Sequence, residues 1–296
     1  MSTPRADRRA TLLIVGCGDI GQRVLRLLQG RWRLLVLSRS EQNFEALRAA
    51  GATPLLGDLD QPASLGRLAG LADAVLHLAP PAAQGWQDHR TAHLVQALAR
   101  GGRARRLVYA STTGVYGDAG GALFDETRAV APASDRARRR VDAERRLRWY
   151  GQACGVSVSV LRIPGIYAGD RPDGHPRERL LRGAPVLLRE HDVHSNHIHA
   201  DDLARACVAA LSRGRPQRVV HVSDDSRLLM GDYFDLAADL CGLPRPPRVT
   251  PEQALLLLSP MQLSFMAESR QLLNERLKRE FRLRLRYPTA AQGLLA

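Results

Sequence analysis

The chain is poor in lysine and has no long apolar run. Lys278 is the only lysine, so arginine supplies the rest of the 43 basic residues. The leucine-rich stretch 254–258 is far shorter than the roughly 20 apolar residues that a membrane-spanning helix needs. The arginine-rich N-terminus leads directly into a strand-like segment rather than into the apolar core of a secretion signal. We therefore expect a cytoplasmic protein with no membrane segment.

Cysteine is also scarce, and its positions exclude two kinds of small stabilised domain. The four cysteines, at positions 17, 154, 207 and 241, form no C-x-x-C pair. This scatter argues against a disulfide framework and against a zinc knuckle. The histidines at positions 191, 194, 197 and 199 lack the partner ligands and the fixed spacing of a zinc site, so we expect no metal.

The formal net charge of +13 raises the question of a polyanionic partner. A basic face gives salt-dependent affinity for phosphate groups. No recognition-helix, RNP-like or zinc-finger pattern accompanies the charge. A solvated basic surface, or an anionic small-molecule ligand, therefore explains the charge better than specific nucleic-acid binding.

Short apolar segments alternate with segments of helical periodicity through the first two-thirds of the chain. The strand-like segments are 12–15, 34–37, 53–56, 74–78, 107–110, 156–161 and 219–222. Helical spacing covers 20–29, 41–50, 63–68 and 91–100, and it resumes at 201–212, 230–241 and 270–280. The alternation predicts an α/β fold with a Rossmann-type, doubly wound parallel sheet.

Glycine and proline become frequent after residue 163, which indicates a smaller C-terminal lobe made of loops and short elements. We place the nucleotide-binding domain at 10–165, with a contribution from about 198–224. The smaller substrate-covering lobe then comprises 166–197 and 225–290.

The most specific local motif is a G-x-G-x-x-G pattern between the first predicted strand and the first predicted helix. It consists of Gly16, Gly18 and Gly21, with Asp19 and Ile20 inside it. Glycine at these positions permits a tight turn, close approach of the backbone to a pyrophosphate, and helix-to-strand packing. The motif predicts that these five residues hold a dinucleotide; a glycine turn that binds nothing is the alternative.

The choice of dinucleotide depends on the end of the second predicted strand. NAD-binding proteins place an acid there to accept hydrogen bonds from the ribose 2′-OH. This chain has Ser38, Arg39 and Ser40 instead, and an arginine can pair with a 2′-phosphate. The pattern favours NADP(H) over NAD(H), unless Arg39 is only a surface cation. Asp58, after the third strand, is placed to accept from the adenine amino group or to cap its own turn.

Several further motifs accompany the glycine turn along nearly the whole chain. They are Gly57-Asp58-Leu59, Val75 to Ala79, Ser111-Thr112-Thr113-Gly114-Val115-Tyr116-Gly117, Leu161 to Tyr167, and His197 to Leu203. With these motifs the sequence resembles the extended short-chain dehydrogenase/reductase family, the NAD(P)-dependent epimerase/dehydratase group. The resemblance implies an extended cofactor across the strand ends, with Ala79 beside it, and a small-molecule substrate under the C-terminal lobe. It also implies a homodimer formed through the helices at 91–100 and 136–150.

The family's catalytic pair is missing. Its chemistry uses a Ser or Thr, a Tyr and a Lys, with Tyr and Lys one helical turn apart, and Thr112 matches the first of these. By the same alignment Arg136 stands at the tyrosine position and Arg140 at the lysine position. No Tyr-x-x-x-Lys exists anywhere, because Asn274 precedes the single lysine by four residues. An arginine stays protonated, so it cannot exchange a proton as tyrosine does, but it can stabilise negative charge.

The resemblance therefore implies an atypical member of the family. Tyr116 is the remaining phenol nearest to Thr112, and it is either a substitute acid or a packing residue. Ser195 stands where nucleotide-sugar enzymes of the family often carry an arginine, which disfavours a nucleotide-sugar substrate. We expect an NADP(H)-dependent oxidoreductase or epimerase-like enzyme in which Arg136 and Arg140 replace the usual pair beside a substrate that carries an anionic group. A non-catalytic NADP(H)-binding sensor or scaffold is the alternative.

Overall fold

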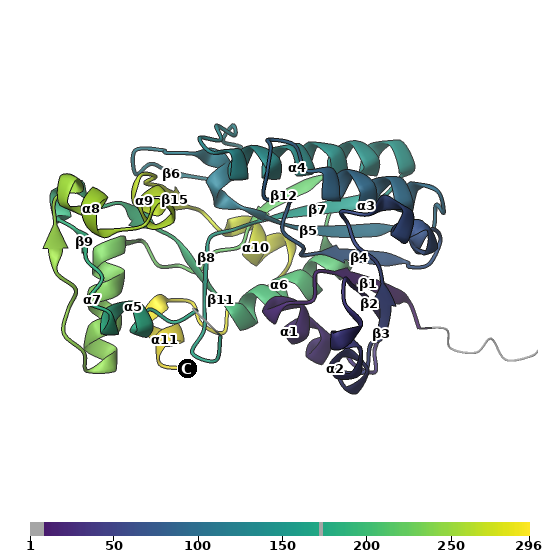
Figure 1. Ribbon diagram of the computed structural model, residues 1–296, viewed down its shortest axis with the longest axis horizontal. Helices are drawn as coiled ribbons and strands as arrows, with labels where there is room; N and C mark the ends of the chain where they lie inside the picture. Colours follow the sequence, from purple (N-terminus) through teal and green to yellow (C-terminus); the bar gives the residue numbers. More distant parts are fainter. Residues whose placement is uncertain (1–8, 172–173) are drawn as a thin grey trace, which may run out of the picture. The chain divides into compact units, whose positions relative to one another are not determined.

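The computed structural model describes residues 9–171 and 174–296, and its largest element is a seven-stranded parallel sheet (Figure 1). The strands are β1 (Thr11–Val15), β2 (Arg33–Ser38), β3 (Thr53–Leu56), β4 (Ala74–His77), β5 (Arg106–Thr112), β7 (Ser157–Ile163) and β12 (Arg218–His221). Their order across the sheet is β12-β7-β5-β4-β1-β2-β3. All seven predicted strand segments occupy this sheet, so the Rossmann-type prediction is confirmed.

The strand order reverses direction between β1 and β4. The chain moves from β1 to β2 and β3 on one side, and then crosses to β4 and β5 on the other. In the parallel register Val15 lies opposite both Leu37 and His77, so β1, β2 and β4 end at the same edge of the sheet. A reversal of this kind opens a crevice at the carboxyl ends of the strands, where ligands of such sheets bind.

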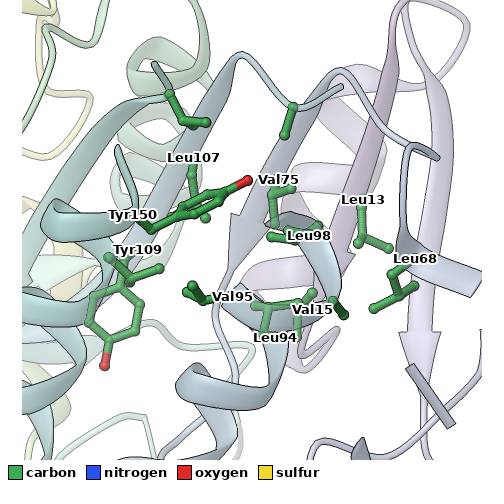
Figure 2. Packing of buried hydrophobic residues seen from close by; sticks show 14 of the residues in the cluster. Leu13, Val15, Leu68, Val75, Leu94, Val95, Leu98, Leu107, Tyr109 and Tyr150 are labelled. Carbon is green, nitrogen blue, oxygen red and sulfur yellow. The ribbon is translucent and has the colours of Figure 1, made fainter. Parts of the chain in front are cut away.

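Helices flank the sheet on both faces. They are α1 (Asp19–Leu28), α2 (Phe44–Ala49), α3 (His89–Ala99), α4 (Asp135–Cys154) and α6 (Ala200–Arg213), with 3-10 turns η1 (Glu41–Asn43) and η2 (Pro62–Leu68). Figure 1 shows α3 and α4 on one side of the strands, and α1 and α6 on the other. Figure 2 shows the apolar core under α3, where Leu94, Val95 and Leu98 face Leu13 and Val75.

The described chain divides into two compact units. The first unit runs to Ser111 and includes Arg138–Leu161 and Ala204–Val219, so it holds most of the sheet. The second unit comprises Thr112–Ala137, Arg162–Leu203 and Val220–Ala296. Residues 112–137, which the sequence analysis grouped with the nucleotide-binding domain, pack with the second unit.

The second unit is built from short elements around two small apolar cores. Its helices are η3 (Thr113–Tyr116), α5 (Arg177–Leu181), η4 (Arg189–His191), α7 (Met230–Cys241), α8 (Pro251–Leu257), α9 (Pro260–Met266), α10 (Glu275–Glu280) and α11 (Ala290–Leu294). Four two-stranded pairs connect them: β6 (Leu123–Phe124) with β15 (Gln271–Leu272), β8 (Gly165–Tyr167) with β11 (His197–His199), β9 (Val186–Leu187) with β14 (Arg248–Val249), and β10 (His194–Ser195) with β13 (Leu228–Leu229). Among the described residues, no helix combines the length and the apolar character needed to cross a bilayer.

Two of the predicted helices differ from the structure. Residues 62–68 form a 3-10 helix that begins at Pro62. The segment predicted as helix from residue 270 begins as strand β15, because Gln271 N and Leu273 N donate to Ala122 O and Phe124 O at 3.0 and 2.9 Å. Helix α10 therefore begins only at Glu275.

The core beneath α3 gives a direct test of the packing. Leu94 is fully buried, whereas Leu27 on α1 is 40% exposed. We expect Leu94→Ala to lower the free energy of unfolding by about 3 kcal/mol, because it leaves a cavity in a close-packed core. Leu27→Ala should lower it by less than about 1 kcal/mol. Urea unfolding followed by circular dichroism measures both values, and equal losses would contradict this packing.

Candidate functional site

The turn between β1 and α1 brings the end of β1 against the segment that follows β4. Leu78 N and Ala79 N both donate to Val15 O, at 2.8 and 2.9 Å. Gly16 has a φ of +89°, and a Cβ built on it would lie 2.4 Å from Ala79 N. Only glycine is compatible with this backbone and this approach. A Cβ on Gly18, in contrast, would meet no described atom within 4 Å. The space beside the start of α1 is therefore open.

The amino end of α1 faces this open space. Gly18 is the N-cap residue, and no described side chain caps the helix. The first backbone N–H groups of a helix have no partner within it and carry partial positive charge, so they attract an anion. Asp19 contributes an opposing negative charge, but its carboxylate pairs with Arg23 Nε at 3.0 Å. Ile20 and Gly21 complete this first turn. The arrangement can bind a phosphate group.

A cavity of about 330 Å³ lies beside the glycine turn, within the first unit. Five of the predicted cofactor residues line it: Gly16, Ser38, Arg39, Asp58 and Ala79. Residues 18–21, which were also predicted, are not among its lining residues and form the adjoining turn of α1. The structure thus brings the ends of β1, β2 and β3, and the segment after β4, to one cavity.

Arg39 projects from an ordered turn at the end of β2. Ser38 Oγ donates to Ser40 O at 2.8 Å, and Ser40 Oγ accepts from Gln42 N at 3.2 Å, which caps η1. Arg39 itself is exposed and forms no ion pair with any described residue. Its guanidinium is therefore available to an anionic ligand in the cavity.

Asp58 stabilises the turn after β3. Its Oδ1 accepts from Asp60 N at 2.9 Å, and its own backbone N–H donates to Ser64 Oγ at 2.9 Å. The capping function considered for Asp58 is thus present, while the residue also lines the cavity.

Three lining residues with amide or charged side chains were missed by sequence reasoning: Gln22, Asn43 and Arg90. Arg90 is the second residue of α3, and its Nε and Nη2 donate to the two carboxylate oxygens of Asp60 at 2.7 and 2.6 Å. Its Nη1 also donates to Pro80 O at 3.2 Å. The sequence feature that could have indicated Arg90 is Asp88, the N-cap residue of α3, which accepts from Thr91 N at 3.2 Å. An N-cap after the fourth strand places the first residues of α3 at the carboxyl edge of the sheet.

Thr112 lies at the end of β5, where it caps η3. Its Oγ1 accepts from Gly114 N at 3.3 Å, and the side chain is half-buried. The preceding residue, Ser111, donates to Glu144 Oε1 at 2.5 Å, which joins β5 to α4.

Tyr116 is fully buried and its hydroxyl is engaged on both sides. It lies 2.5 Å from His221 Nε2 and accepts from Arg162 Nη1 at 2.7 Å. His221 Nδ1 lies 2.9 Å from Leu273 O, a carbonyl that can only accept, so Nδ1 carries the proton and Nε2 accepts from the phenol. The proton of Tyr116 is thus committed to a buried hydrogen bond. This environment favours a packing residue over a substitute acid.

The two arginines at the positions of the missing pair have different surroundings. Arg140 donates to Tyr109 Oη at 3.0 Å and to Ala110 O at 2.8 Å, so it is bound to β5. Arg136 is exposed, and its guanidinium lies over the ring of Phe265, 5.2 Å from its centre. A spacing of four residues predicts that Arg136 and Arg140 lie on one face of α4. Their side chains nevertheless contact different partners.

Two of the four histidines in residues 191–199 pack against aromatic rings. His197 stacks on Tyr233 with ring centres 3.9 Å apart, and His199 lies against Tyr167 and Tyr287. Within residues 9–171 and 174–296, no group of three or more His, Cys, Asp or Glu side chains is arranged to hold a metal ion. Among these residues, His199 Nδ1 also accepts from Asp201 N at 3.2 Å, at the start of α6.

Burial shifts the pKa of several groups in both units. It lowers the pKa of His77 to about 3 and those of His197 and His221 to about 4, so all three are neutral near pH 7. Burial raises the pKa of Asp224 to about 7. Of these groups, His221 is the one whose proton position follows from its hydrogen bonds.

Gly16 and Gly18 differ in how strongly an added methyl group would destabilise the fold. We expect Gly16→Ala to lower the free energy of unfolding by about 2–4 kcal/mol, because the Cβ would overlap the Ala79 backbone at an unfavourable φ. Gly18→Ala should change it by less than about 1 kcal/mol, since its φ of −78° suits alanine and the space is open. Thermal and urea unfolding of both variants measure the difference. A large loss in Gly18→Ala would show that the space is closed.

The Tyr116–His221 contact predicts a pH-dependent stability. His221 has a folded pKa of about 4, below its unfolded value of about 6.5. The contribution of neutral His221 to the free energy of unfolding is therefore complete above pH 6.5. It is lost as the pH falls towards 4, because in this range His221 binds a proton in the unfolded chain but not in the folded chain. His221→Gln can still accept the hydrogen bond from Tyr116 but cannot titrate. The stability difference between wild type and His221→Gln should shrink by about 1–2 kcal/mol between pH 7 and pH 4.5; a constant difference would contradict the assignment.

Comparison with known proteins places this geometry in a family. The model of the NAD dependent epimerase/dehydratase family matches residues 12–223. The curated protein YeeZ from Escherichia coli K12 is 27% identical over 248 residues, which cover 79% of this chain and 84% of YeeZ.

Solved structures agree over almost the full length. A conserved protein of unknown function from Silicibacter pomeroyi DSS has a TM-score of 0.80 at 33% identity and 97% coverage of both chains. UDP-glucose 4-epimerase from Thermotoga maritima has a TM-score of 0.79 at 19% identity and 96% coverage of both, which shows a shared fold. The predicted resemblance is confirmed: this chain belongs to the NAD-dependent epimerase/dehydratase family.

Proposed function

We propose that this chain is an NADP(H)-dependent oxidoreductase or epimerase-like enzyme of the extended short-chain type that works without a Tyr-x-x-x-Lys pair. One observation carries the proposal. Arg39 lines the cavity beside the glycine turn, exposed and without an ion pair among the described residues, where NAD-binding proteins carry an acid.

The residues around the turn fit a dinucleotide. The open space at Gly18 and the amino end of α1 would hold the pyrophosphate. The cavity of about 330 Å³ would hold the adenosine end, with Asp58 and Ala79 on its wall and Arg39 beside the 2′-phosphate. A bound nicotinamide would supply hydride transfer, which no side chain can provide.

Thr112 is the proposed contact to the reacting oxygen of the substrate. Its Oγ1 accepts an N–H from Gly114, which orients the hydroxyl. A hydroxyl that accepts one bond can still donate its own hydrogen. Thr112 can therefore donate to a substrate carbonyl or alkoxide.

Arg136 supplies positive charge instead of an exchangeable proton. It forms no ion pair with any described residue, and its contact with Phe265 holds the guanidinium at the surface of the second unit. A permanent cation stabilises negative charge in the substrate or in the transition state. Arg140, bound to Tyr109 and Ala110, keeps a second permanent charge beside β5. Two permanent cations favour a substrate with an anionic group.

Calorimetric titration with NADPH, NADP+, NADH and NAD+ tests the cofactor assignment. We expect NADPH to bind at least about tenfold more tightly than NADH, which corresponds to about 1.4 kcal/mol from pairing of the 2′-phosphate with Arg39. Arg39→Asp should reverse the preference, because a carboxylate repels the phosphate and accepts from the ribose hydroxyl. Gly18→Ala, folded but with a methyl group in the open space, should weaken all four ligands. Equal affinities for NADPH and NADH would contradict the assignment.

Turnover then separates an enzyme from a binding protein. Purified protein with saturating NADPH or NADP+ is assayed on carbonyl and hydroxyl compounds with and without a carboxylate. Activity that falls in Thr112→Val and Arg136→Ala, while dinucleotide binding is unchanged, supports the assigned roles. Binding of NADP(H) without turnover on any compound would instead favour a sensor or scaffold.

A further inference from the structure

An ion pair joins the cavity-lining residue Arg90 to the loop after β3. Arg90 on α3 and Asp60 in the loop after β3 form two parallel hydrogen bonds of 2.7 and 2.6 Å. The Arg90 side chain is 19% exposed and that of Asp60 is 46% exposed. Such a two-point contact fixes the orientation of the guanidinium more firmly than a single bond would. Asp60 thus holds Arg90, which lines the cavity, in a defined orientation.

The donors of Arg90 are already directed at protein atoms. Nε and Nη2 face the two oxygens of Asp60, and Nη1 donates to Pro80 O at 3.2 Å. A guanidinium offers its paired donors as a fork, and here the carboxylate of Asp60 occupies that fork. Arg90 is therefore poorly placed to grip a phosphate, although it lines the cavity.

Asp60 lies within the electrostatic reach of Arg39. The hydrogen bond from Arg90 lowers the pKa of Asp60, and the charges of Arg90, Arg39 and His93 lower it further. The carboxylate is thus ionised. The backbone N–H of Asp60 donates to Asp58 Oδ1 at 2.9 Å. Asp58, Arg90 and Arg39 line the same cavity, so Asp60 lies next to the wall on which we place the 2′-phosphate. Without Arg90 it would compete with that phosphate for Arg39 and would repel it.

We propose that Arg90 determines the preference for NADP(H) by neutralising Asp60, so that Arg39 alone meets the 2′-phosphate. This inference rests on the proposed function, because it needs a dinucleotide in the cavity. Arg90 is then a specificity-determining residue that acts through another side chain. A ligand with a 2′-hydroxyl carries no charge at this point, so its affinity responds much less to Asp60.

The test uses two fragments that differ only at the 2′ position and need no catalysis. Adenosine 2′,5′-bisphosphate and adenosine 5′-monophosphate are titrated by calorimetry into wild type, Arg90→Gln, Asp60→Asn and the double variant. Arg90→Gln should weaken the bisphosphate about tenfold and the monophosphate less than about twofold. Asp60→Asn should tighten the bisphosphate a few-fold. In the Asp60→Asn background, Arg90→Gln should have an effect of less than about twofold, because the charge that it neutralised is gone.

Two further variants control for structure. Arg103 forms a similar two-point pair with Asp73, at 2.9 and 3.0 Å, and does not line this cavity. Arg103→Gln should leave the ratio of the two affinities unchanged. Arg90→Lys keeps the charge with less precise geometry, so it should keep most of the preference. If Arg90→Gln does not fold, the expected tightening of the bisphosphate in Asp60→Asn carries the test, and no tightening would overturn the inference.

The outcomes separate this inference from the function on which it rests. Equal affinity of wild type for the two fragments would overturn both. A wild-type preference that survives in Arg90→Gln would overturn this inference alone. So would a loss of the same size for both fragments, which indicates a structural role, or an undiminished loss in the Asp60→Asn background, which indicates direct contact with the phosphate.

Discussion

The backbone contact between the end of β1 and the segment after β4 is the constraint on which the nucleotide side of this protein depends. Val15 O receives the N–H groups of both Leu78 and Ala79, and Gly16 leaves no side chain between them. Because β1 and β4 are neighbours at the reversal of strand order, this contact sets the floor of the cavity. It also fixes the path of the chain into α1, so that the amino end of that helix faces open space.

The charged side chains of the two units have different kinds of partner. On the nucleotide side, Asp19, Asp58 and Asp60 lie near the expected position of an anionic ligand, yet two of them are paired with arginines and the third holds a turn. In the second unit the cation at the former tyrosine position, Arg136, has an aromatic partner instead. A guanidinium cannot titrate at any useful pH. In the proposed reaction Arg136 would therefore act only through its charge, and proton exchange would have to involve other groups.

Two buried polar contacts hold the segments on either side of Thr112. Ser111 joins β5 to Glu144 on α4, and Tyr116 is held between Arg162 and His221 in a buried polar cluster. Buried polar groups of this kind are costly unless every donor and acceptor is satisfied. In this cluster the hydroxyl of Tyr116 has a partner on each side.

Much of the fold, and five of the residues that line the cavity beside the glycine turn, could be predicted from sequence, because the signals there are local. Apolar segments of strand length, the spacing of three glycines, and Arg39 at a strand end each report on a few consecutive residues. The contacts that were missed join distant segments. Arg90 pairs with Asp60 across 30 positions and Tyr116 meets His221 across 105, while β15 forms a strand only because β6 offers a partner. The hydrophobic periodicity of a sequence does not indicate such long-range pairings.

Hydrogen exchange at the first strand-to-helix turn tests the central claim most directly. If the backbone amides at the start of α1 bind the pyrophosphate, addition of NADPH should slow exchange in residues 16–22 by at least about tenfold, with slower exchange also at the end of β2. Binding of NADPH with unchanged exchange in residues 16–22, or no protection anywhere at millimolar NADPH, would contradict the account.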